Sequence, residues 1–87
     1  MAETPDWIAR ELDGLRQMRD EVRVQLHLGK AEAREAWDDV EKRWHQLEGK
    51  LQAAREDHRG DLGEIRETAK RLAREIRDGY RHLKSLL

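Results

Sequence analysis

The feature that most constrains this sequence is a long stripe of apolar side chains at helical spacing that no proline interrupts. Successive members lie three or four residues apart, which is the repeat of one face of an α-helix. The pattern predicts one long helix over about residues 5–57, with Thr4 as N-cap and Pro5 at the first helical position. The members of the stripe are Ile8, Leu12, Leu15, Met18, Val22, Leu26, Gly29, Ala33, Ala36 or Trp37, Val40, Trp44, Leu47, Leu51 and Ala54.

A second apolar stripe with the same spacing follows a break near residues 58–61. Asp61 and Glu64 have the spacing of a capping box, which marks the start of a helix. We therefore predict a turn at 58–61, a second helix at about 61–86, and a single helical domain over residues 1–87. This stripe consists of Leu62, Ile65, Ala69, Leu72, Ile76, Gly79 or Tyr80, Leu83 and Leu86.

The composition agrees with an all-α fold. Charged residues make up 43% of the chain, aromatic residues 5%, and the net charge is −1. A composition of this kind with helical periodicity is typical of long helices and coiled coils. The absence of cysteine excludes disulfides and thiolate chemistry. No apolar run resembles a secretory signal or a membrane span, so we expect a soluble, cytoplasmic protein.

One segment, residues 22–28, also fits a strand. Val22, Val24, Leu26 and Leu28 alternate with polar residues at a period of two, as in a half-buried strand. A strand there would have no partner, and helical pattern flanks the segment on both sides. We favour a helix on which Val24, Leu28 and Ala31 form a short second apolar face, opposite the main stripe.

The two predicted helices differ in length, and this difference implies a partner. At 1.5 Å per residue they would be about 80 Å and about 38 Å long, so the second helix covers only half of the first. The uncovered apolar strip indicates an interface. We expect an elongated antiparallel homodimer with a three-helix bundle at each end, crossing near residues 31–32, where Leu26 meets Trp37 of the partner subunit. The expected interface residues are Ile8, Leu12, Leu15, Val22, Leu26, Gly29, Ala33 and Trp37.

The alternative arrangement is a monomeric three-helix bundle, in which the chain breaks near Gly29. Gly29 could end a helix as its C-cap residue. However, residues 30–32 supply no N-cap side chain and few residues for a turn. For this reason the sequence favours the continuous helix.

The sequence contains few candidates for chemistry. Glu41, His45 and Glu48 share one helix face, a spacing that some helical metal sites use, but a solvated salt-bridge face is the favoured interpretation. Trp37 and Trp44 lie on the apolar stripe and are expected to pack in the core. No nucleophile–base pair or glycine-rich phosphate loop occurs. We expect no enzyme activity, no cofactor and no metal.

The charges are distributed unevenly along the chain. Residues 1–61 carry 11 basic and 15 acidic side chains, whereas residues 62–87 carry 7 and 4. Five of the basic residues in this second part share one helix face and form a basic ridge. This ridge could bind nucleic acid or an anionic membrane. The favoured interpretation is that it pairs with acidic residues of the first helix, for example Arg77 with Glu41. The ridge consists of Arg66, Lys70, Arg74, Arg77 and Arg81.

Residues 21–37 together with Trp44, and residues 71–87, resemble short bacterial coiled-coil proteins. The resemblance implies a bacterial helical hairpin and transfers no functional residues. The predicted function is that of a structural or protein-interaction module that oligomerises through its long amphipathic helix and engages a further protein. The alternative is an anion-binding protein that acts through the ridge on the second helix.

Overall fold

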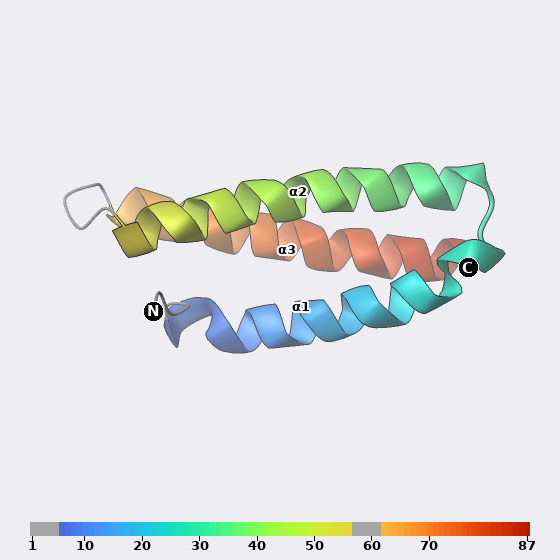
Figure 1. Ribbon diagram of the computed structural model, residues 1–87, viewed down its shortest axis with the longest axis horizontal. Helices are drawn as coiled ribbons and strands as arrows, with labels where there is room; N and C mark the ends of the chain where they lie inside the picture. The colour runs from blue at the N-terminus through green and yellow to red at the C-terminus, as the bar shows by residue number, and fades with distance from the viewer. Residues whose placement is uncertain (1–5, 57–61) are drawn as a thin grey trace.

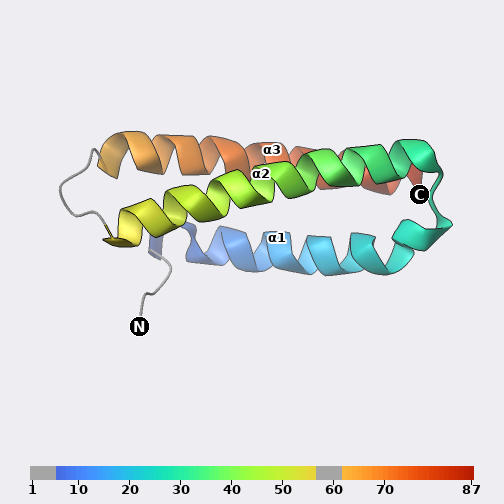
Figure 2. The same ribbon diagram turned by 45° about the horizontal axis from the view of Figure 1, so that its top comes forward.

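The computed structural model describes residues 6–56 and 62–87, and this part of the chain is built from helices. Helix α1 (Asp6–Gln25) leads through a short 3-10 turn, η1 (Leu26–Leu28), into α2 (Ala31–Glu56), and α3 (Leu62–Leu86) follows. The three long helices lie along the longest axis of a 45 × 19 × 17 Å bundle, with α2 antiparallel to α1 and α3 (Figures 1 and 2). The all-α prediction is confirmed. The expected caps at Thr4 and Asp61 and the turn at 58–61 lie outside the described residues.

The chain reverses direction between α1 and α2, so the expectation of an uninterrupted first helix is wrong. In this connector, residues 26–30, the amide of Gly29 donates a hydrogen bond to the carbonyl oxygen of Leu26 at 2.9 Å. Gly29 is extended, with φ −83° and ψ 157°. The carbonyl of Lys30 accepts hydrogen bonds from the amides of Ala33 and Arg34 at 3.0 and 3.3 Å. The chain thus forms the three-helix bundle that the sequence offered as its alternative.

Glycine is needed in the connector because neighbouring side chains leave no room for a Cβ atom. A Cβ on Gly29 would lie 2.8 Å from the Cβ of Ala33 and 2.9 Å from Cδ2 of Leu87. Both distances are shorter than van der Waals contact. The reversal therefore uses the small size of glycine and requires no left-handed backbone, since no glycine in the described residues has a positive φ.

The core consists of the predicted apolar stripes, now packed against one another within one chain. α1 contributes Ile8, Leu12, Leu15 and Val22; α2 contributes Ala33, Val40, Trp44, Leu47 and Leu51; α3 contributes Ala69, Leu72, Ala73, Ile76, Tyr80 and Leu83. All of these belong to the predicted stripes except Ala73. Ala73 is buried because α3 packs against two helices, which requires an apolar face wider than a single stripe.

Helix α3 is the central element of the bundle. It packs most extensively against α2 and less extensively against α1, whereas α1 and α2 approach one another least. α2 and α3 pack tightly at Gly79, where a Cβ atom would clash with Cγ2 of Val40. Small residues at a helix crossing allow the two axes to come close together.

Ion pairs line the edges of the core. Arg19 donates two hydrogen bonds to the carboxylate of Glu41, at 2.9 and 2.8 Å, and joins α1 to α2. Two pairs join α1 to α3, namely Glu11 with Arg77 at 2.8 Å and Glu21 with Lys84 at 3.0 Å. Arg77 therefore binds Glu11 and not Glu41, because α1 of the same chain occupies the groove beside α3.

Candidate functional site

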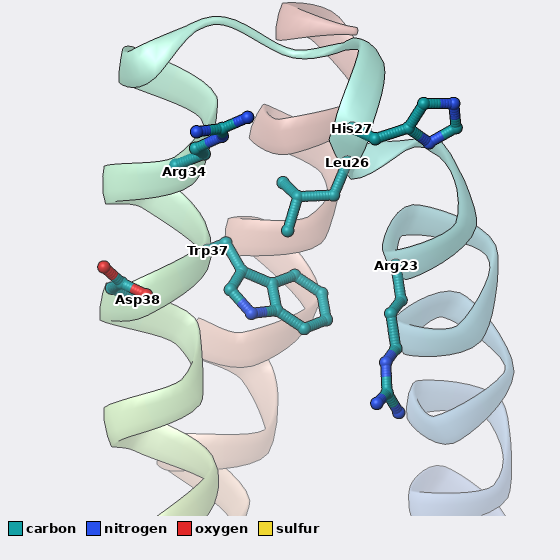
Figure 3. A pocket seen from close by; sticks show the side chains of 6 residues that line it. All are labelled: Arg23, Leu26, His27, Arg34, Trp37 and Asp38. Atoms are coloured by element: carbon teal, nitrogen blue, oxygen red, sulfur yellow. The ribbon is translucent and has the colours of Figure 1, made fainter.

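A hollow of about 480 Å³ lies between the C-terminal end of α1 and the N-terminal half of α2. Its walls come from the two sides of the connector and are Arg23, Leu26, His27, Arg34, Trp37 and Asp38. Figure 3 shows the indole of Trp37 pointing from α2 into the space beside α1, with Leu26 above it and Arg23 across from it. The hollow exists because α1 and α2 are spread apart over α3.

Trp37 is the aromatic residue that lines the hollow. Its ring packs against Tyr80, with ring centroids 6.3 Å apart and ring planes inclined at 43°. The side chain is only partly buried, unlike Trp44, which the core encloses. The expectation that both tryptophans pack in the core thus holds fully for Trp44 and partly for Trp37. A tryptophan with an accessible face is typical of binding surfaces.

Basic side chains surround the hollow. Arg23, His27 and Arg34 are exposed, and none of them forms an ion pair among residues 6–56 and 62–87. Asp38 is the acidic residue of the lining. The electrostatic field at the rim therefore favours negatively charged groups.

Exposed aliphatic side chains lie at the same end of the bundle. Val24 and Leu28 are each 71% exposed, and Leu87 is 37% exposed. Leu87 reaches the connector, since a Cβ atom added to Gly29 would lie only 2.9 Å from Cδ2 of Leu87. The second apolar face predicted from residues 22–28 is thus present on helical backbone, and the strand alternative is wrong. Large exposed aliphatic side chains at one end of a bundle are a feature of interaction surfaces.

A smaller hollow of about 280 Å³ lies farther along α1 and α2, and Arg19 and Trp44 are among the residues that line it. The guanidinium of Arg19 stacks on Trp44, 5.6 Å from the ring centroid, while it binds Glu41. Burial lowers the pKa of Arg19, but the hydrogen bond and charge of Glu41 outweigh this effect, so the pKa is raised overall. This arginine is held in place as a structural cation.

The basic ridge of α3 is divided between structural and solvent-facing roles. Arg77 binds Glu11, and the guanidinium of Arg66 lies 5.7 Å from the ring centroid of Trp7. The remaining members, Lys70, Arg74 and Arg81, form no ion pair among the described residues. The five cations therefore do not act as one continuous free surface.

The metal-site candidates do not converge. Glu41 is bound by Arg19, and His45 and Glu48 are exposed on α2. Among residues 6–56 and 62–87, no three histidine, cysteine, aspartate or glutamate side chains are grouped so that they could hold a metal ion.

The predicted interface residues take two different positions. The helices of the same chain bury five of them, namely Ile8, Leu12, Leu15, Val22 and Ala33. The apolar strip whose exposure implied a homodimer is therefore covered within one chain. Leu26 and Trp37 remain partly exposed in the hollow, and Gly29 lies in the connector. The predicted homodimer itself stays a prediction.

Sequence reasoning missed the charged lining of the hollow, that is, Arg23, His27, Arg34 and Asp38. These residues lie off the apolar stripe and come together only because the chain reverses at the connector. The available signal was the pair Val24 and Leu28, whose exposure on a polar face was unusual for a simple amphipathic helix.

No family model, curated protein or solved structure matches the chain. Within the described residues, none of the helices has the length and apolar character needed to span a membrane.

Proposed function

We propose that this chain is a protein-binding module that takes up an acidic, amphipathic helical segment of a partner protein at the connector end of the bundle. The observation that supports the proposal best is the coincidence of apolar and cationic side chains at that end. The connector surface, as we call it, consists of Arg23, Val24, Leu26, Leu28, Arg34 and Trp37. In this proposal the module acts by binding alone.

The extent of the apolar surface favours a protein segment over a small ligand. The hollow has the size of a ligand pocket, but exposed aliphatic side chains also lie outside it at the same end of the bundle, on Val24 and Leu28. A helical segment presents apolar side chains spaced three and four residues apart along one face, and this face can enter the hollow beside Leu26 and Trp37. Tryptophan and arginine are the residues that most often dominate the energetics of such interfaces.

The charges define the chemistry of the partner segment. Arg23 on α1 and Arg34 on α2 both line the hollow, and both lack an ion pair among the described residues. Carboxylates that flank the apolar side of a bound helix would pair with them. Such pairs contribute mainly to the specificity and rate of association, while burial of Trp37 and Leu26 supplies most of the affinity.

The alternative function, binding of nucleic acid or an anionic membrane by the ridge of α3, has weaker support. Arg66 and Arg77 are occupied by contacts with Trp7 and Glu11. Fewer free cations release fewer counterions, so the affinity for phosphates falls.

The proposal is tested by selecting binders from a displayed library of random helical peptides. We expect the selected peptides to carry apolar residues at helical spacing together with aspartate or glutamate. In two-dimensional NMR spectra of the protein, addition of a selected peptide should shift the indole N–H signal of Trp37 and leave that of the enclosed Trp44 nearly unchanged.

Charge reversal at the hollow supplies the decisive comparison. The double variant Arg23→Glu with Arg34→Glu should lose at least about ten-fold in affinity for the selected peptides, a loss on the scale of two ion pairs at an interface. The matched control, Arg10→Glu with Arg74→Glu, makes the same change of net charge at exposed sites outside the connector surface and should bind as the unaltered protein does. Equal binding by both double variants, or selected peptides without acidic residues, would refute the proposal.

A further inference from the structure

We propose that the connector can straighten and that two copies of the chain then exchange their α1 helices, forming an antiparallel dimer in which α1 and α2 are one continuous helix. The bundle described above is the closed form, and the dimer is the open form of the same packing. This inference concerns association of the chain with itself and goes beyond the proposed binding of another protein.

The apolar stripe passes through the connector without losing its phase. Leu26, Gly29 and Ala33 follow one another at steps of three and four, as they would on a continuous helix. A loop that evolved only to reverse the chain has no need to preserve this spacing. The pattern therefore suits a straight helix as well as the observed turn.

The contacts between α1 and α2 are symmetric about the connector. Arg19 and Glu41 are 22 residues apart, so the pair is centred on Lys30. Leu26 and Trp37 line the same hollow, and their midpoint lies one and a half residues farther along, between Ala31 and Glu32. Consider two straight copies of the α1–α2 helix that cross antiparallel near residues 30–32. Each residue of α1 in one copy then faces a residue of α2 in the partner subunit, and the same two positions face one another within the closed chain. Exchange thus retains every contact of the core and changes only the connector.

The connector is the weakest part of the closed form. The N-terminus of α2 has no side-chain cap from Lys30, which carries no side-chain oxygen. Instead, the backbone carbonyl of Lys30 accepts hydrogen bonds there, from the amides of Ala33 and Arg34. A cation beside the positive end of the helix dipole is also unfavourable. Only residues 29 and 30 separate η1 from α2, and short connections of this kind promote domain swapping.

α1 is also the helix that leaves the bundle most easily. It packs less extensively on α3 than α2 does, and it barely approaches α2. Two of its links to α3 are ion pairs of partly exposed side chains, Glu11 with Arg77 and Glu21 with Lys84, and such pairs contribute little to stability. Exchange of α1 therefore requires only a limited opening of the closed form.

The substitution Gly29→Ala separates the two forms. In the closed form the added Cβ would lie 2.8 Å from the Cβ of Ala33 and 2.9 Å from Cδ2 of Leu87, whereas in a continuous helix alanine is preferred over glycine. We expect the dissociation constant of the dimer to fall by roughly thirty-fold or more, because the preference of alanine over glycine in a helix acts once in each of the two chains. Size-exclusion chromatography with light scattering measures it over a series of protein concentrations.

The matched control is Gly49→Ala, which makes the same chemical change within α2. A Cβ at Gly49 meets no atom within 4 Å, and position 49 is helical in both forms. This variant should leave the balance of monomer and dimer unchanged.

The substitution Lys30→Pro should have the opposite effect to Gly29→Ala. The extended conformation of Gly29 is the one that a residue before proline prefers, and no backbone hydrogen bond of the connector in the described residues is donated by the amide of Lys30. A proline inside the continuous helix of the open form would remove a hydrogen bond and clash with the preceding turn. We expect a folded monomer at every concentration, with helicity checked by circular dichroism.

Exchange of α1 itself is tested by complementation between two charge variants. Arg19→Glu alone and Glu41→Arg alone each place like charges in the pair that joins α1 to α2. When the two variants are unfolded and refolded together, only an exchanged heterodimer restores opposite charges at both ends. Native mass spectrometry should detect the heterodimer in at least a several-fold excess over either homodimer.

Three results would each overturn the inference. They are a Gly29→Ala variant that remains monomeric at the highest concentration reached, a Lys30→Pro variant that dimerises as the unaltered chain does, and a refolded mixture without preference for the heterodimer. The last result would show that copies associate, if at all, without exchanging α1.

Discussion

Tyr80 and Trp44 are the buried residues of the described core that carry polar side-chain groups, and they satisfy one another. The indole N–H of Trp44 donates a hydrogen bond to the hydroxyl oxygen of Tyr80. Tyr80 is fully buried, and burial raises its pKa to about 12, although the hydrogen bond from Trp44 acts in the opposite direction. A phenolate there would be desolvated, so the fold requires the neutral phenol.

Stability should therefore fall in strongly alkaline solution. An unfolded tyrosine has a pKa of about 10, and the folded value is about 12. The contribution of Tyr80 is fully present below pH 10 and is lost as the pH rises through 12, a loss on the order of 2 kcal/mol. Chemical denaturation at a series of pH values measures the free energy of unfolding.

The single tyrosine of the chain allows a direct check of this prediction. Ultraviolet difference absorbance of tyrosinate should titrate with a midpoint near pH 12 in the folded protein, and a midpoint near 10 would contradict the prediction. Tyr80→Phe removes this titration and serves as the control for lysine deprotonation. It also leaves the Trp44 N–H without its acceptor, at a cost of about 1–3 kcal/mol.

Gly79 gives a second prediction at the scale of one residue. Gly79→Ala should lower the free energy of unfolding by about 1–3 kcal/mol, because the added methyl group overpacks the contact with Val40. Gly49→Ala, in open space on α2, should instead raise it by up to about 1 kcal/mol. Thermal and urea unfolding compare the two variants, and equal effects would show that α2 and α3 do not meet closely at Gly79.

At the scale of elements, the three helices contribute unequally to the bundle. α3 contacts both other helices, whereas α1 depends on α3 for most of its packing. Segments with fewer packing contacts open at lower free energy than the rest of the molecule. α1 should therefore separate from the α2–α3 pair before the whole bundle unfolds.

Native-state hydrogen exchange tests this order of opening. We expect amides of α1 around Leu15 to exchange through an opening whose free energy is lower than that for amides around Leu47 and Ile76, which lie at the α2–α3 contact. The free energies are obtained by NMR at increasing, sub-denaturing concentrations of denaturant. One common free energy for all three helices would indicate a single cooperative unit.

Helical periodicity predicted helical structure along the chain and the faces that are buried, but it predicted α1 and α2 as one helix. Leu12, Leu47 and Ile76 are buried as the stripes require, because the spacing of apolar residues determines which face of a helix avoids water. Periodicity carries no information on a reversal that preserves the spacing. For this reason the sequence offered the break at Gly29 only as an alternative, with Gly29 as a possible C-cap, and favoured the continuous helix.

At the scale of the whole molecule, one stripe is compatible with two arrangements that differ greatly in length. The closed bundle has a radius of gyration of 14.0 Å and a longest dimension of 45 Å. In the exchanged dimer, α1 and α2 would form one helix of about 75–80 Å. The two forms are therefore easily distinguished in solution.

Small-angle X-ray scattering of separated fractions supplies the measurement. The monomer fraction should give a radius of gyration near 14 Å, and any dimer fraction, for example of Gly29→Ala, should have a longest dimension of about 80 Å or more. A dimer little longer than the monomer would indicate side-by-side association of closed bundles.

The sequence by itself determined the class of fold, the bounds of α3 along the chain and nearly all of the core residues, because these follow from the spacing of apolar residues. It also indicated that Val24 and Leu28 lie on a second apolar face. Only the tertiary structure decided that α1 folds back on α3 and that Arg23 and Arg34 face one hollow. The reason is physical: the reversal at Gly29 depends on the space left by Ala33 and Leu87, and contacts between residues far apart in the chain are not encoded in local spacing.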